Sequence, residues 1–219
     1  MNDNKKFWNR IAFIYEKVQT AGKGSRKFYD KLNTEIGKQL QSDMKVLELA
    51  MGPALLTEGI ARQCNQLYAT DFSEKMVLQA RRKKLPDNVV IEQADATNLP
   101  YKDEEFDAIV IANALHIMPD PKKAICEIKR VLKKDGIIIA PTYTREITNN
   151  KLKLKVMSAV GFITYFPWND KGYRDFLTEQ GLKIVYHNII MWSDFPESFV
   201  VCKKSDKGAD DEKISYQKK

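Results

Sequence analysis

Residues 45–61 read KVLELAMGPALLTEGIA, an apolar run that meets a turn of small residues. The run over 46–49 has the composition of a buried β-strand, and the turn over 50–54 interrupts it. Helix-forming residues follow at once, and Pro53 suits the first turn of a helix, so we expect a helix over 53–63. A strand, a tight turn and a helix in succession are typical of α/β proteins that bind nucleotide-like ligands. The sequence therefore predicts a ligand site at this turn.

Length and composition limit the class of protein. A chain of 219 residues, 43% of them hydrophobic, is long enough to bury a core in one main domain. No stretch approaches the roughly 20 apolar residues of a membrane span, and the first residues, MNDNKKFWNR, carry charges where a signal peptide needs an apolar segment. Cys64, Cys126 and Cys202 are far apart in apolar settings, which predicts reduced core thiols and no metal or disulfide site. We therefore expect a cytoplasmic protein.

The net charge is basic. It amounts to +7, from 36 Lys and Arg against 29 Asp and Glu. Such an excess can mark a surface for nucleic acid or anionic lipid. Here the basic residues are spread along the chain and mixed with acids, which favours an ordinary solvated surface. Charge alone therefore does not assign a nucleic-acid role.

Helical and strand patterns alternate along the chain. Repeated βα units predict an α/β fold with a doubly wound, seven-stranded Rossmann-like sheet and helices on both faces. Only 192–196 separate the last two strands, which predicts a hairpin and a C-terminal antiparallel edge strand. The expected strands are 45–49, 66–70, 89–93, 107–111, 137–140, 182–190 and 197–203, and the expected helices are 5–20, 23–41, 53–63, one capped by Ser73, 122–132, 151–160 and 169–180.

A dinucleotide is the first ligand to consider, because doubly wound sheets bind ligands at the carboxyl ends of their strands. The fingerprint G-x-G-x-x-G would have to align on Ala50, Gly52 and Leu55, so two of its three glycines are missing. Asp71, about 20 residues on, suits the ribose of a dinucleotide or of another ligand. The turn therefore argues against a dinucleotide site.

Four segments, in order, resemble the class I S-adenosylmethionine-dependent methyltransferases. Motif I of that family, commonly written (D/E)-x-G-x-G-x-G, is matched by ELAMGPA at 48–54. YATDFSEKM at 68–76 resembles the family's second-strand segment, and 93–143 follows the family from the adenine-contacting acid to the fifth strand. FWNRIAFIYE at 7–16 is similar to the lid helix of ubiquinone/menaquinone-type and related small-molecule methyltransferases. The resemblance covers nearly everything but the tail.

The resemblance implies S-adenosylmethionine as the cofactor. Asp71 would accept hydrogen bonds from both ribose hydroxyls, and Glu48 would lie near the cationic methionine end. Asp95 would accept from the adenine amino group. The other implied cofactor contacts are Ala50, Gly52, Phe72, Met76, Ala96 and Asn113. The competing structural interpretations are a helix cap for Asp71, a turn for Asp95 and core packing for Met76.

Two alanines depart from the family pattern. Ala50 and Ala54 stand where the family has glycine, and alanine is disfavoured where φ is positive. Either both positions keep φ below zero, or affinity for the cofactor is reduced. The second alternative would suit a cofactor-fold binding protein without catalytic activity.

The acceptor side of the site is expected to follow the fourth and fifth strands. Methyl transfer is an in-line displacement, so the protein mainly has to orient the acceptor and exclude water. The candidate catalytic residues are His116, as a base or a steering residue, and Tyr143. A histidine packed at a loop is an equally good interpretation of His116, and aromatic residues near it also serve packing. The expected lining of the substrate pocket is Trp8, Tyr15, Tyr165 and Trp168.

The resemblance also divides the chain and names a function. Residues 1–42 are expected to form a helical lid and 43–204 the cofactor-binding domain, with 142–180 as a cap and 205–219 as a disordered tail. We expect a methyltransferase, as a monomer or homodimer, acting on a small lipophilic, aromatic or thiol-like acceptor. The alternatives are an RNA or protein methyltransferase and a non-catalytic binding protein. The apolar segment between the fifth and sixth strands favours a small molecule over nucleic acid.

Overall fold

The computed structural model describes residues 3–20, 24–144, 164–192 and 195–205. Strands and helices alternate in these ranges as the sequence predicts. The helices are α1 (Asp3–Thr20), α2 (Ser25–Gly37), α3 (Thr57–Ala61), α4 (Glu74–Ala80), the 3-10 turn η1 (Leu115–Ile117), α5 (Pro121–Val131) and α7 (Asp170–Glu179). The strands are β1 (Lys45–Leu49), β2 (Gln66–Asp71), β3 (Val89–Gln93), β4 (Phe106–Ile111), β5 (Leu132–Ile139), β6 (Thr142–Tyr143), β7 (Leu182–Trp192) and β8 (Phe195–Lys204).

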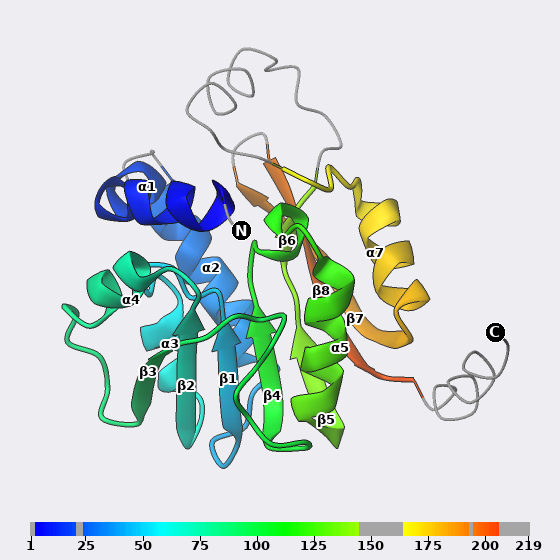
Figure 1. The fold of residues 1–219 in the computed structure, drawn as a ribbon. Helices are drawn as coiled ribbons and strands as arrows, with labels where there is room; N and C mark the ends of the chain where they lie inside the picture. Colours follow the sequence, from blue (N-terminus) through cyan, green and yellow to red (C-terminus); the bar gives the residue numbers. More distant parts are fainter. Residues whose placement is uncertain (1–2, 21–23, 145–163, 193–194, 206–219) are drawn as a thin grey trace, which may run out of the picture.

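The described strands form one sheet in the order β3-β2-β1-β4-β5-β8-β6, and β7 also pairs with β8. The first five strands of this order run parallel to their neighbours. β8 runs antiparallel to β5, β6 and β7, and it forms the expected hairpin with β7. The doubly wound α/β prediction is confirmed (Figure 1).

The sheet has eight strands within the described residues, where the sequence suggested seven. The additional strand is β6, which follows β5 after a break at Ala140 and Pro141. Proline has no backbone N–H to donate, so the ladder is interrupted there. In the short strand that follows, Tyr143 is paired in register with Glu197 of β8.

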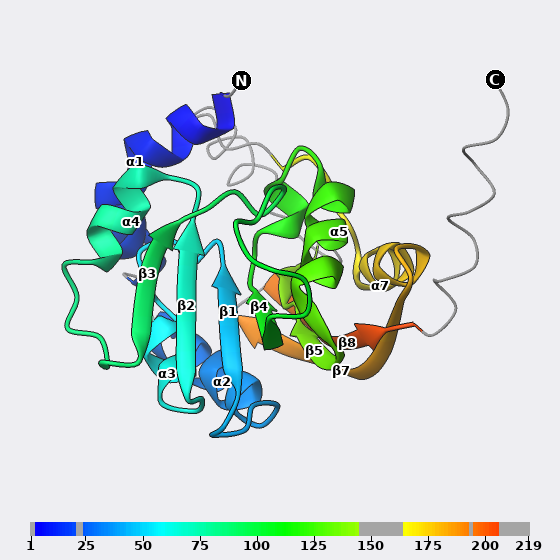
Figure 2. The same cartoon turned by 60° about the horizontal axis from the view of Figure 1, so that its bottom comes forward.

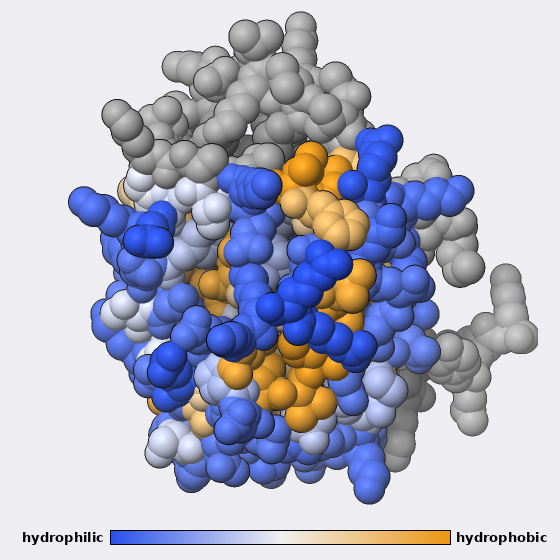
Figure 3. Space-filling view, turned by 90° about the vertical axis from the view of Figure 1, so that its left-hand side faces the viewer, coloured by the Kyte–Doolittle hydropathy of each residue, from blue (hydrophilic) through white to orange (hydrophobic). Residues whose placement is uncertain are grey.

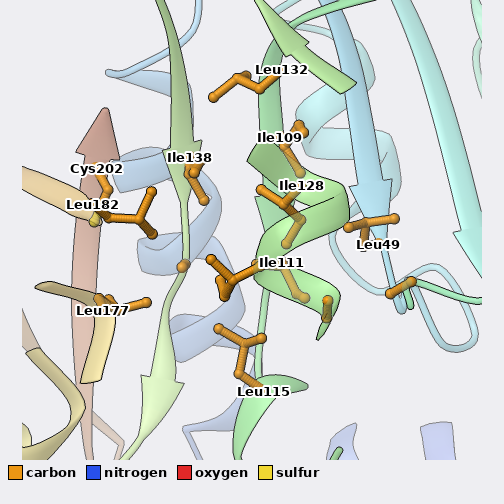
Figure 4. Packing of buried hydrophobic residues seen from close by; sticks show 14 of the residues in the cluster. Leu49, Ile109, Ile111, Leu115, Ile128, Leu132, Ile138, Leu177, Leu182 and Cys202 are labelled. Carbon is orange, nitrogen blue, oxygen red and sulfur yellow. The ribbon is translucent and has the colours of Figure 1, made fainter. Parts of the chain in front are cut away.

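Alternate residues along each strand pack against helices on opposite faces of the sheet. On one face, α5 and α7 cover a cluster that includes Leu49, Ile111 and Ile138 (Figure 4). On the other face, α2, α3 and α4 cover Val46 and Val110, among other residues. Figures 1 and 2 show the resulting three layers, with α1 near the carboxyl ends of the central strands and beside α4. The ligand site is therefore expected at that edge of the sheet.

The helix after the first strand is shorter than predicted. It begins at Thr57, and Pro53 lies in the preceding turn and not in the first helical turn. Gly52 and Ala54 have φ values of 56° and 60°, which a right-handed helix cannot contain. The prediction of a helix over 53–63 was wrong at its start because propensity does not report the sign of φ.

Other boundaries agree with the sequence pattern within four residues, except that β5 begins at Leu132, five residues before the predicted start at 137. Ser73 caps α4 as predicted, since its Oγ accepts a hydrogen bond from the backbone N–H of Met76. The N-terminal helical pair is present as α1 and α2. The predicted helix over 151–160 and the predicted tail beyond Ser205 lie outside the described residues.

Candidate functional site

A cavity of about 310 Å³ lies at the carboxyl ends of β1, β2 and β4. Its wall combines the turn after β1, the ends of the next strands and one side of α1. Predicted cofactor residues in this wall are Glu48, Ala50, Gly52, Asp71, Phe72, Met76, Asp95, Ala96 and Asn113, and Trp8, Tyr15 and Tyr143 from the other predicted groups also line it. The tertiary fold therefore gathers these predicted residues from six separate segments around one space.

The turn after β1 has an unusual backbone. Ala50, Gly52 and Ala54 all have positive φ, at 54°, 56° and 60°. The alternative that the two alanines keep φ below zero is therefore wrong. A Cβ added to Gly52 would meet nothing within 4 Å, so the glycine serves its backbone angle and not close packing. The two alanines hold a conformation that L-residues disfavour, which stores local strain in the turn.

Asp71 ties this turn to the start of α4. Its Oδ2 accepts a hydrogen bond from the backbone N–H of Gly52 at 2.9 Å, and its Oδ1 accepts from that of Ser73 at 2.8 Å. Burial raises the pKa of Asp71 to about 6, and these backbone N–H groups oppose the shift. Both carboxyl oxygens are thus held in place at the edge of the cavity.

Glu48 is a buried carboxyl at the same cavity. Burial raises its pKa to about 8, and the nearby charge of Asp71 adds to the shift. Its Oε2 has no hydrogen-bond partner among the described residues. A buried, unpartnered oxygen is costly, so a cationic or N–H-bearing ligand would be stabilised there. A second buried carboxyl with an unpartnered oxygen, that of Glu197, is described below.

The predicted adenine end of the cavity is more open. Asp95 is exposed, and its Oδ1 accepts hydrogen bonds from the backbone N–H and the hydroxyl of Thr97 at 2.9 and 2.8 Å. Phe72 and Ala96 form the wall beside it. Met76 is 1% exposed and borders the cavity from the core, so its packing role and its predicted ligand role coincide.

Asn113 organises the other end of the cavity. It has a φ of 54°, a left-handed conformation that asparagine tolerates better than most residues. Its Oδ1 accepts from the backbone N–H of Tyr143 at 3.0 Å, and its Nδ2 donates to Glu197 at 3.2 Å. The side chain therefore connects the end of β4 to β6 and β8.

Glu197 and Tyr29 are two residues that sequence reasoning missed. Glu197 is fully buried, burial raises its pKa to about 8, and its Oε2 has no partner within the described chain. Tyr29 lines the cavity beside Tyr15, and burial raises the pKa of both phenols. The available signal for Glu197 was one acidic residue within the otherwise apolar run FPESFVVC.

Three predicted residues lie away from the cavity lining. His116 is buried, with Nδ1 2.8 Å from the Thr142 hydroxyl, and this packed position does not support its prediction as a base. Trp168 stacks between Phe166 and Phe176, at centroid distances of 5.1 and 4.6 Å. Tyr165 is 39% exposed and does not line the cavity. The described cavity lining therefore includes neither aromatic residue: Trp168 packs against Phe176 of α7, and Tyr165 is exposed.

Comparisons with known proteins agree with this geometry. Residues 47–140 match a family described as a methyltransferase domain. The demethylmenaquinone methyltransferase of Lactobacillus johnsonii is 32% identical over 172 residues, which are 73% of this chain and 65% of that protein. The corresponding enzyme of Clavibacter sepedonicus is 38% identical over 96 residues, 43% of this chain and 39% of that protein. The chain thus spans less than two thirds of the length of these relatives.

A solved structure has the same fold at low identity. It is the magnesium protoporphyrin IX methyltransferase of Synechocystis with bound SAH, the demethylated product of S-adenosylmethionine. The TM-score is 0.69 at 16% sequence identity, and the match covers 92% of this chain and 98% of that one. At this identity the likeness concerns the fold.

Proposed function

Because this chain belongs to the class I S-adenosylmethionine-dependent methyltransferases, we propose that it transfers a methyl group to a small-molecule acceptor. The cofactor is S-adenosylmethionine. The observation that carries the proposal is the convergence of Glu48, Asp71 and Asn113 on one cavity at the carboxyl ends of the strands. These side chains match the chemistry of a cationic ligand with ribose hydroxyls.

The residues at the turn fit the sugar and the amino-acid part of this cofactor. Each Asp71 oxygen accepts one backbone hydrogen bond and retains acceptor capacity for a ribose hydroxyl. Glu48 has a buried oxygen, Oε2, without a hydrogen-bond partner among the described residues. A cationic group of the cofactor would be that partner. A cation beside Glu48 would also lower its raised pKa, so binding is expected to release a proton near neutral pH.

The residues at the open end fit the adenine. Phe72 and Met76 border the cavity with apolar surface, and Asp95 stands at its rim with a carboxyl group. We assign Asp95 to the adenine amino group and the backbone of Ala96 to a ring nitrogen. A ring held between apolar groups with one polar edge contact is an arrangement common to small-molecule sites.

The opposite end fits an aromatic acceptor that carries a hydroxyl group. Trp8, Tyr15, Tyr29 and Tyr143 contribute rings and phenol groups to the lining, and Asn113 lies among them. A mostly apolar wall with a few polar groups binds a lipophilic ring and orients its substituents. Demethylmenaquinone methyltransferases are named for a quinone acceptor, and we extend that acceptor class, a lipophilic quinol, to this chain.

The chain's own contribution to the reaction is orientation and exclusion of water. When bound, S-adenosylmethionine supplies an electrophilic methyl group on sulfur, a good leaving group. Tyr143 and Asn113 would orient the acceptor atom toward that methyl group. We propose Glu197 as a positioning residue, because its carboxyl accepts a hydrogen bond from the Asn113 side chain.

α1 is suited to act as the lid over the cavity. It contributes Trp8 and Tyr15 to the lining, so it closes one side of the space. Its described polar contacts with the α4 region are two hydrogen bonds to Asn9 Oδ1, from the Ser73 hydroxyl and from the backbone N–H of Lys75, and two ion pairs, Lys5 with Glu74 and Lys83 with Glu16. Surface ion pairs of this kind stabilise weakly, so they would oppose a movement of α1 only slightly.

A non-catalytic binding protein remains the second candidate. The observation in its favour is the strained backbone of Ala50 and Ala54, which replace two glycines of motif I. The non-catalytic candidate, like the methyltransferase, is expected to bind S-adenosylmethionine, but it is expected to show no turnover. An RNA methyltransferase would need a basic groove at the cavity, and the described lining carries Glu48, Asp71, Asp95 and Asp120 and no Lys or Arg.

Two measurements on the full chain test the proposed function. Calorimetry with S-adenosylhomocysteine and with NAD should show binding of the first alone. An assay for S-adenosylhomocysteine production should then show turnover with a prenylated hydroquinone or catechol and none with total RNA. The assay should also include a thiol and a porphyrin as acceptors. Binding of S-adenosylhomocysteine without turnover on any of these small molecules would favour the non-catalytic candidate. Binding of NAD alone would overturn the cofactor assignment.

A further inference from the structure

The outward side of α1 and the adjacent side of α4 carry large exposed apolar residues. Phe13 is 48% exposed, Ile14 is 56% exposed, and Leu78 is 46% exposed. The ring of Phe13 lies between two α4-region cations, with Lys75 Nζ at 6.0 Å and Arg82 Cζ at 5.7 Å from its centroid. Lys75 and Leu78 are three positions apart on α4, and Arg82 follows the end of that helix, so Leu78 lies next to the two cations that contact Phe13. We treat Phe13, its chain neighbour Ile14 and Leu78 as one apolar patch.

Basic residues surround this patch. Exposed cations on the two elements and the following turn are Lys6, Arg10, Lys17, Lys75, Arg81, Arg82 and Lys84. The neighbouring acids Glu16 and Glu74 are each engaged by a lysine. We call this surface, with the three apolar residues and these seven cations, the α1–α4 face. Figure 3 shows apolar residues in orange among hydrophilic residues in blue on this side of the molecule.

The same helix also borders the cavity on its opposite side. With about 100° between successive residues of a helix, Trp8 and Tyr15 project to one side of α1 and Lys6, Phe13 and Lys17 to roughly the opposite side. The first two line the cavity, and Phe13 and Lys17 are exposed. α1 therefore separates the cavity from the α1–α4 face by the thickness of one helix.

We propose that the α1–α4 face docks on the surface of a membrane that contains anionic lipid. Lysine and arginine side chains would lie at the phosphate groups while Phe13, Ile14 and Leu78 enter the boundary between headgroups and acyl chains. Among the described residues, no helix is long and apolar enough to cross a bilayer. A nucleic acid would use the cations and leave the apolar patch in water, which makes lipid the better match.

Docking would have a consequence for the acceptor. A lipophilic quinol resides in the membrane, and a protein that rests on the bilayer through α1 holds its cavity next to that reservoir. Movement of α1 would then open the cavity toward the lipid. This consequence rests on the proposed function, whereas the docking itself requires only the α1–α4 face.

Vesicle co-sedimentation of the full chain tests the docking. We expect binding to phosphatidylcholine vesicles that contain about one third phosphatidylglycerol, much weaker binding to pure phosphatidylcholine, and a decrease as salt rises. Replacing Phe13→Ser and Ile14→Ser together, or Lys75→Glu and Arg82→Glu together, should each weaken binding at least about tenfold. The first pair removes two apolar side chains that would enter the lipid, and the second pair reverses two charges that would lie at the phosphate groups.

Matched variants control for general effects of charge and hydrophobicity. Val185→Ser with Met191→Ser removes two apolar residues of β7 that are 47% and 55% exposed, and Lys171→Glu with Lys203→Glu reverses two exposed charges elsewhere. Both control pairs should bind the anionic vesicles about as well as the unchanged chain.

Affinity for S-adenosylhomocysteine, measured on the same samples, separates the two proposals. Absence of vesicle binding with intact cofactor binding would overturn the docking alone. Equal loss in the control pairs, or binding to total RNA in place of vesicles, would also overturn it. Vesicle binding by a chain that does not bind S-adenosylhomocysteine would count against the proposed function and leave the docking supported.

Discussion

Replacing Ala50 by glycine should stabilise the protein, because the turn after β1 holds this alanine at a φ of 54°. A left-handed conformation costs an L-residue roughly 1–2 kcal/mol relative to glycine. Glycine in turn gains about 0.4–1 kcal/mol of conformational freedom in the unfolded chain, which opposes the benefit. The difference leaves a stabilisation of about 0.5–1 kcal/mol for Ala50→Gly, or about 1–4 °C in melting temperature.

Ala54 provides an internal comparison at a φ of 60°. This residue is 4% exposed, so glycine would also remove a buried methyl group. The loss of about 0.8 kcal/mol of burial offsets the relief of strain, and Ala54→Gly should change stability by less than about 0.5 kcal/mol. Ala124→Gly, within the helix α5 and fully buried, should destabilise by about 2 kcal/mol, from helix propensity and burial together.

Urea unfolding of the ligand-free chain, followed by circular dichroism, measures all three variants. The slopes of free energy against urea must agree for the comparison to hold. A destabilised Ala50→Gly variant would show that φ at this position is not positive in solution or that its methyl group has a packing role. The structure predicts that the free energy of unfolding is highest for Ala50→Gly, intermediate for Ala54→Gly and lowest for Ala124→Gly.

Three further outcomes are expected. Asp71→Asn should weaken S-adenosylhomocysteine binding about 10- to 150-fold, from 1.5–3 kcal/mol for a charged hydrogen bond, whereas Asp175→Asn on α7 should not change it; equal affinities by calorimetry would remove Asp71 from the site. Because burial raises the pKa of Glu197 from 4.5 to about 8, the folded state holds its proton more tightly than the unfolded chain does. Its contribution to stability is therefore present below pH 4.5 and is lost, by up to about 1.4 kcal/mol per pH unit, as pH rises toward 8; urea unfolding of Glu197→Gln at several pH values should show a shallower decline, and an unchanged decline would contradict the burial argument. Deletion of 1–20 should leave a folded core that no longer turns over the acceptor, and full activity of that shortened chain would show that α1 is not a lid.

The alternation of apolar runs and amphipathic helices was sufficient to predict the doubly wound sheet. The strand at Lys45–Leu49 and the cap at Ser73 were predicted to the residue, because buried strands and helix caps are recorded in local composition. Asp71 and Asn113, which we propose as cofactor contacts, were predicted near strand ends whose position the sequence defines, and both line the cavity. Local chemistry and the order of segments carry this information.

Other features depend on contacts between segments that are distant in the chain. Glu197 is an isolated acid in the sequence, and only the pairing of β8 with β6 brings it to Tyr143 and to the Asn113 side chain. His116 and Trp168 were candidates for the site, with packing as the alternative for each, and their contacts with Thr142 and Phe176 place them outside the described cavity lining. Periodicity reports which face of an element is buried and not which neighbour buries it.

The sign of φ at motif I shows the same division most clearly. From sequence, Ala50 and Ala54 allowed either sign, and helix propensity favoured a helix starting at Pro53. In the structure both alanines have positive φ, and Asp71 accepts a hydrogen bond from the backbone N–H of Gly52 between them. Composition determined that a small-residue turn would follow the strand. The conformation of the turn occurs together with a hydrogen bond between Gly52 and Asp71, which are 19 positions apart in the sequence. The local preference of alanine does not indicate the positive φ values of this turn.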